Sequence, residues 1–167
     1  MSEQTLPDLD YFDPEPEGPA TPVWFQVTVD SDDPHAQARF WAAALGYRRE
    51  DPNDLVEAVI AAGWADRDAD TVEVDGRRAF ATATGIVHPD DVDAPRGRRR
   101  RILFQHVADR EPGKNKWHLD LNVGREHIDA EVARLTALGA TEKYKVDEPS
   151  GFHTTMADPE GNLFCVQ

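Results

Sequence analysis

Two segments of the chain alternate apolar and polar side chains, which is the pattern of a β-strand with two different faces. The segments are "FQVTVD" at 25–30 and "WHLDLNV" at 117–123. The polar positions are Gln26, Thr28 and Asp30 in the first segment and His118, Asp120 and Asn122 in the second. Each segment therefore predicts a strand with one polar face.

A helix is predicted after each of these strands. In the first half, Asp33 can cap a helix, Pro34 suits its first turn and Gly46 suits its end. Apolar side chains then recur at helical spacing, at Ala38, Trp41, Ala42 and Leu45 in the first half and at Ile128, Val132, Leu135 and Leu138 in the second. Both halves thus predict a strand followed by a helix.

The two halves form an internal repeat. Trp24 and Gly46 are separated by 22 positions, and so are Trp117 and Gly139. Further strand candidates follow each helix, and the halves end alike, with "ILFQHV" at 102–107 and "NLFCVQ" at 162–167. That likeness matches Gln105 with Cys165. The pattern predicts two βαβββ units in tandem, with an extra short helix near 54–64 in the first.

The chain divides into a tail and one two-module domain. Residues 1–21 are rich in acidic residues and proline and carry no Lys or Arg, so we expect a disordered tail. The predicted boundaries are 22–167 for the domain, about 22–108 for the first module, 109–115 for the linker and about 116–167 for the second module.

Composition and charge restrict the classes of partner. The formal net charge is −14, so we expect neither nucleic acid nor an anionic membrane surface as a partner, since both need a positive face. The basic cluster "PRGRRRR" at 95–101 is interpreted as a solvated loop, and a grip for an acidic ligand is the alternative. The single cysteine, Cys165, excludes a disulfide framework and fits a reducing cytoplasm. We expect no signal peptide and no membrane span.

Three segments in order carry a resemblance to a known family: "VTVDSDDPHAQARFWAAALGY", "PGKNKWHLDLNV" and "MADPEGNLFCV". Together they resemble the glyoxalase-like branch of the vicinal oxygen chelate superfamily, which holds glyoxalases, bleomycin-type resistance proteins and extradiol dioxygenases. The resemblance covers roughly 22–167. It implies an α+β fold of two tandem βαβββ modules, with curved mixed sheets around a cleft and helices on the convex side. It also implies a homodimer, because members often pair modules between chains.

The resemblance also locates candidate metal ligands. Metal-using members hold one ligand on the first strand and one on the last strand of each module, and these positions match Gln26, Gln105, His118 and Cys165. Amides are weak ligands for a divalent ion, and positions 105 and 165 commonly hold glutamate in metal enzymes. We therefore expect no cofactor and no standard metal site. A divalent metal stays open as the alternative, with Gln26, His118 and Cys165 as its ligands.

The candidate ligand-binding residues are Gln26, Thr28, Gln105, His118, Asp120, His153 and Cys165. His118 is the candidate catalytic residue, since imidazole often transfers protons near neutral pH and Asp120 shares its face. The predicted function is small-molecule binding in the cleft. A lyase, isomerase or dioxygenase acting through His118 stays open, and so does an interaction module with a filled cleft. Trp64 is interpreted as core, with an aromatic lid as the alternative.

Overall fold

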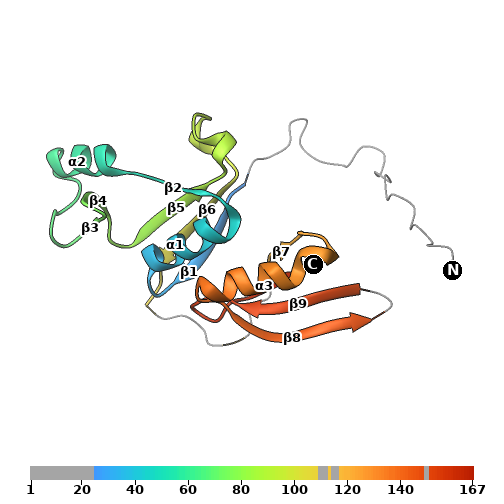
Figure 1. Cartoon of the computed structure of the whole chain (residues 1–167). Helices are drawn as coiled ribbons and strands as arrows, with labels where there is room; N and C mark the ends of the chain where they lie inside the picture. The colour runs from blue at the N-terminus through green and yellow to red at the C-terminus, as the bar shows by residue number, and fades with distance from the viewer. Residues whose placement is uncertain (1–24, 109–112, 114–116, 149–150) are drawn as a thin grey trace, which may run out of the picture.

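The computed structural model describes residues 25–108, 113, 117–148 and 151–167. The predicted tail at 1–21 lies outside these residues, and so does the predicted linker at 109–115 apart from Gly113. The described residues form two modules with the same order of elements (Figure 1).

Each module has a strand, a helix and three further strands. The first module contains β1 (Val27–Ser31), α1 (Pro34–Leu45), β2 (Arg48–Arg49), β5 (Ala83–Val87) and β6 (Arg101–His106). Two short 3-10 helices, η1 (Pro89–Asp91) and η2 (Arg96–Arg98), precede β6. The second module contains β7 (Asp120–Leu121), η3 (Arg125–His127), α3 (Ile128–Ala137), β8 (Thr141–Glu148), β9 (Gly151–Ala157) and β10 (Leu163–Val166).

The sheets of the two modules share one topology. The strand orders are β1-β6-β5-β2 and β7-β10-β9-β8. In each sheet the first strand runs parallel to the last, and the other neighbours are antiparallel. This confirms the predicted α+β fold of two tandem βαβββ modules. The strand pairs among the described residues do not join the two sheets into one.

The first module carries an insert between β2 and β5. Its helix α2 (Asn53–Ala61) confirms the short helix predicted near 54–64, and a hairpin of β3 (Thr71–Val74) and β4 (Arg77–Phe80) follows. The hairpin turn holds Asp75 and Gly76 at φ 51° and 76°, the left-handed conformation that a type I′ hairpin turn requires at both central residues. Trp64 lies in the turn after α2 and is 83% exposed, so its interpretation as a core residue is wrong.

Local signals explain where α1 begins and ends. The Asp33 carboxylate accepts the N–H of Ala36 at 2.9 Å, Pro34 occupies the first turn, and Gly46 at φ 67° ends the helix. Each of these positions confirms the sequence prediction. In the described part of the chain, no helix combines the length and apolar character needed to cross a bilayer.

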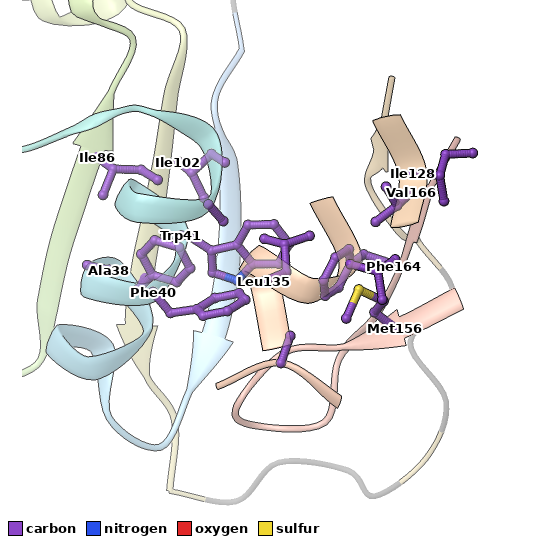
Figure 2. Close-up of a cluster of buried hydrophobic side chains, with 14 residues drawn as sticks. Ala38, Phe40, Trp41, Ile86, Ile102, Ile128, Leu135, Met156, Phe164 and Val166 are labelled. Carbon is purple, nitrogen blue, oxygen red and sulfur yellow. The ribbon is translucent and has the colours of Figure 1, made fainter. Parts of the chain in front are cut away.

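One hydrophobic core joins the two modules (Figure 2). The ring of Trp41 on α1 packs edge-on against Phe164 on β10, with centroids 5.1 Å apart, and Leu135 on α3 is fully buried. The Arg134 guanidinium on α3 donates to the backbone carbonyl of Ala44 at the end of α1, at 2.7 Å. Helix α1 packs on the first sheet and α3 packs on the second, so the two helices meet between the sheets.

The turn that joins β9 to β10, within residues 157–162, connects the modules through polar contacts. Asp158 is 3% exposed, and its carboxylate accepts the Trp41 indole N–H at 3.1 Å and a Gln37 amide N–H at 3.2 Å. The Glu160 carboxylate accepts the Ser31 hydroxyl at 2.7 Å and the Asp33 backbone N–H at 2.9 Å. The turn before β10 thus holds the second module against the start of α1.

Candidate functional site

Three chemically active side chains converge on the outer face of the second module. Asp120 on β7 is the register partner of Cys165 on β10, and His118 lies two residues before Asp120 on the same face. The backbone N–H of Cys165 donates to Leu119 at 2.9 Å, which continues the pairing toward His118. One ligand atom from each of the three side chains lies within 4.8 Å of the other two.

The site is open to water. The side chains of His118 and Asp120 are 50% and 44% exposed, and the His118 Nε2 lies 3.3 Å from a carboxylate oxygen of Asp120. The two side chains therefore meet across one intervening residue. A carboxylate in this place favours one orientation of the imidazole ring.

Neighbouring strands extend the same face. Thr155 on β9 is the register partner of Cys165, and its hydroxyl lies 3.7 Å from the Cys165 sulfur. His153 lies two residues before Thr155 and is half-buried, so it shares this face about 7 Å along the strand. On β8, the half-exposed Tyr144 pairs with Thr155. The structure thus groups His118, Asp120 and Cys165 closely and places His153 at the edge of the group.

The three converging groups fit a thiophilic divalent ion. Imidazole, carboxylate and thiolate are zinc ligands, and catalytic zinc sites commonly use three protein ligands and leave one position open. Ligand atoms around tetrahedral zinc lie about 3.3–3.8 Å apart. The His118–Asp120 distance of 3.3 Å already falls in this range, and all three ligand atoms lie within 4.8 Å of one another. Manganese prefers oxygen ligands, and a set that depends on a thiolate suits it poorly.

The first module carries a different arrangement at the corresponding place. The Gln26 carbonyl oxygen accepts a hydrogen bond from Arg101 at 2.8 Å, and its amide N–H donates to the Thr28 hydroxyl at 3.3 Å. The Arg101 guanidinium also forms two hydrogen bonds with the Glu50 carboxylate, at 2.9 and 2.6 Å. Gln26 and Thr28 are thus brought together, but they contact Arg101 and not the second-module group.

The strand registers separate Gln105 from Gln26. Gln105 pairs with Asp30, four residues after Gln26, which corresponds to about 13 Å along the strand. Thr28 pairs with Leu103 as Asp120 pairs with Cys165. If Gln26 corresponds to His118, then Leu103, not Gln105, corresponds to Cys165. The two sequence matches are therefore incompatible, because likeness between short strands does not determine their register.

Arg101 and Glu50 are the residues of this face that the sequence reasoning missed. Burial by itself raises the pKa of Glu50, but the hydrogen bonds and charge of Arg101, together with Arg96 and Arg99, outweigh burial and leave that pKa below its ordinary value. The interpretation of the basic segment as a solvated loop is wrong for Arg101, whose side chain is 3% exposed. This last arginine of the segment, directly before "ILFQHV", was the available signal, because a charged residue at the start of a buried strand needs a partner.

Comparison with known proteins places the fold. The family model described as a glyoxalase-like domain matches residues 26–167. A glyoxalase/bleomycin resistance protein/dioxygenase family enzyme from Burkholderia phytofirmans PsJN is 17% identical, with a TM-score of 0.55, over 84% of this chain and 94% of that chain. The fosfomycin resistance protein FosX from Mesorhizobium loti is 11% identical, with a TM-score of 0.54, over 92% of each chain.

A third similar structure contains a metal. It is a variant of FosX from Listeria monocytogenes, complexed with Mn(II) and 1S,2S-dihydroxypropylphosphonic acid. It is 12% identical, with a TM-score of 0.51, over 85% of this chain and 86% of that chain. A comparison with curated proteins found no match. The match of the family model to most of the chain, on two βαβββ modules, shows that the protein belongs to the glyoxalase-like family of the vicinal oxygen chelate superfamily.

Proposed function

We propose that this protein binds a small molecule on the outer face of β7, β10 and β9. The observation that supports the proposal is the convergence of His118, Asp120 and Cys165 on an open sheet face. These side chains offer hydrogen-bond donors and acceptors, and Asp120 adds a negative charge. Tyr144, on the strand beside Thr155, offers an aromatic surface for an apolar part of the ligand. The free thiol at Cys165 suits a reducing compartment, so a cytoplasmic location is part of the proposal.

A second candidate function is metal-assisted catalysis of the lyase, isomerase or dioxygenase type. The same three side chains favour it, because they form a donor set for a thiophilic divalent ion. Such an ion, when bound, would polarise a substrate oxygen. Without an ion, His118 would transfer a proton and Asp120 would orient its ring. Metal-free binding remains the first proposal, since the three side chains already form a polar recognition surface by themselves.

One experiment separates the two candidates. The purified chain is analysed for metal, and its backbone amide NMR signals are then followed during a screen of small carboxylates, aldehydes and aromatic metabolites. Binding at the proposed site should shift the signals of Asp120, Thr155 and Cys165, and His118→Ala should abolish those shifts. His127→Ala, at an exposed histidine beside α3, is the matched control and should retain them. Shifts confined to β1 and β6 would contradict the proposal.

Stoichiometric zinc in the purified chain would favour the second candidate over the first. A zinc content that His118→Ala and Cys165→Ser both remove would identify the bound site. A content that neither substitution changes would locate the metal elsewhere and exclude these residues as its ligands.

We also propose that a second copy of the chain completes the site. Among the described residues, strands β1 and β7 stand at the ends of their sheets, which is where a sheet can extend into another chain. Phe25 and Trp117 precede these strands and are 82% and 89% exposed. Pairing between copies would cover the apolar rings and bring the outer face of a first module beside that of a second module. Because both copies are acidic, the contact must rely on apolar area rather than on net charge.

Sedimentation analysis of the purified chain tests the assembly. The wild type should sediment as a dimer, and Trp117→Glu should shift it toward the monomer without loss of helical circular dichroism. Trp64→Glu changes an equally exposed tryptophan in the insert and should leave the dimer intact. A monomeric wild type at concentrations at which the ligand still binds would refute this part of the proposal.

A further inference from the structure

The outer face of the first module contains a largely buried ion pair between Arg101 and Glu50. The Arg101 side chain is 3% exposed, and that of its partner Glu50 is 19% exposed. The guanidinium forms two hydrogen bonds with the Glu50 carboxylate and a third with the Gln26 carbonyl oxygen. Arg99 adds a second guanidinium 3.6 Å from the same carboxylate. The cation is therefore held by three oxygens of its own chain.

Gly85 on β5 makes room for this pair. A Cβ atom at position 85 would lie 2.5 Å from a terminal nitrogen of Arg101 and 2.5 Å from an oxygen of Glu50. Real Cβ atoms do not approach other atoms so closely, so a side chain at this position would displace the pair. The ion pair fits the sheet surface because residue 85 has no side chain.

The strand registers place Arg101 at the position in the first module that corresponds to the His118, Asp120 and Cys165 group in the second. With Gln26 matched to His118, Thr28 corresponds to Asp120 and Leu103 to Cys165. On the same register Arg101, beside Gln26, corresponds to Leu163, beside His118. The first module thus has a fixed positive charge where the second has an aliphatic side chain.

We infer that Arg101 takes the place of a metal ion in the first module and that it excludes divalent cations from Gln26 and Glu50. The carboxylate that would attract a cation is already neutralised by a bidentate partner, and Gln26 presents its oxygen to the same guanidinium. An approaching divalent ion would meet a positive charge at hydrogen-bond distance from both oxygens. Gln26 is therefore a ligand of Arg101 and not of a metal. This inference does not depend on which molecule the second module binds.

The test uses a background in which the second module is silenced by His118→Ala and Cys165→Ser, two substitutions on the outer sheet face. Titration calorimetry with ZnCl₂ and with MnCl₂ should detect no specific site in this background. Arg101→Ala, added to it, removes the hydrogen bonds of Arg101 to the oxygens of Glu50 and Gln26. The affinity for at least one of the two ions should then rise at least tenfold. Arg101→Lys, which keeps the positive charge, should give no gain.

Two results would overturn the inference. One is binding in the silenced chain with Arg101 intact that Gln26→Ala abolishes. The other is a folded Arg101→Ala chain that gains no affinity. If Arg101→Ala does not fold alone, circular dichroism with and without the two salts replaces calorimetry. Recovery of the fold by either ion, lost again on Glu50→Gln, supports the inference, and no recovery overturns it.

Discussion

The two modules share a backbone topology but differ in the chemistry of their outer faces. In the first, Arg101 and Glu50 neutralise each other in a largely buried ion pair, and Gln26 accepts a further hydrogen bond from Arg101. In the second, His118 and Asp120 remain half-exposed beside a thiol. The helix-covered faces are apolar in both modules and merge into one core. The comparison indicates that packing preserves the repeat on the inner face, whereas the outer face is free to acquire a different chemistry in each copy.

The turns that precede the last strands differ in the same way. Before β6, the arginine segment pairs within its own module: the Arg100 guanidinium donates to the Asp91 carboxylate at 2.8 and 3.0 Å. Before β10, the acidic turn reaches across to the other module through Asp158 and Glu160. The first module therefore positions its last strand by internal ion pairs, and the second positions its last strand by contacts with α1.

The largest expected effect is the loss of the ion pair of the first module. Glu50→Ala should lower the free energy of unfolding by about 3–5 kcal/mol, because it leaves the Arg101 guanidinium buried without its carboxylate. Urea denaturation measures the change. The control is Glu57→Ala, which breaks the exposed pair with Arg67 and should move the midpoint little. Equal effects from the two substitutions would mean that the Arg101–Glu50 pair is not buried as the structure shows.

The contact between the modules should give the next largest effect. Asp158→Ala removes the acceptor for the Trp41 indole and the Gln37 amide, so two buried donors lose their partner. The expected loss is about 2–4 kcal/mol in the free energy of unfolding. Asp93→Ala, at an exposed aspartate near η1, is the control. If Asp158→Ala instead produced two separate unfolding transitions, the modules would be joined by this turn more than by the shared core.

Added zinc, which tests the second candidate function, should distinguish the two outer faces in a single measurement. At a concentration of 100 Kd, an ion bound only to the folded chain stabilises it by about 2.7 kcal/mol, which raises the melting temperature. His118→Ala should abolish the rise and Gln26→Ala should retain it, because the donor set belongs to the second module. Cobalt(II) in place of zinc should give a thiolate charge-transfer absorption that Cys165→Ser removes. Loss of the zinc response on Gln26→Ala would place a ligand in the first module.

The repeat and the helices could be predicted from the sequence because their signals are local. Alternation marked the first strand of each module, and Asp33, Pro34 and Gly46 marked the ends of α1. The grouping of His118 with Asp120 is also local, since the two residues share one strand face. Each of these features depends on side chains only a few positions apart.

The features that could not be predicted from the sequence involve residues far apart in the chain. Arg101 and Glu50 are 51 positions apart. The residues next to each of them in the sequence do not indicate that the two side chains pair. The orientation of the modules depends on Trp41 and Phe164, which the hydrophobic pattern marks as buried without indicating against what. As a result, the expectation of one shared hollow followed from the resemblance, whereas in this chain the helices lie between the sheets.

Acid titration should give the smallest effect, and its sign follows from the lowered pKa of Glu50. Burial opposes this shift, but Arg101 and its neighbouring arginines outweigh it. A carboxylate whose pKa is lower in the folded than in the unfolded chain stabilises the fold fully above its ordinary pKa of 4.5. That contribution is lost as the pH falls from there through the lowered value. The difference in unfolding free energy between the wild type and Glu50→Gln should therefore be constant near neutral pH and should shrink below pH 4.5.

Gln105→Ala, an exposed neutral change on the same sheet face, should give a difference that stays constant over this range. A difference between wild type and Glu50→Gln that grew on acidification would mean that burial, not Arg101, dominates the pKa of Glu50, and the outer face of the first module would then lack its internal cation.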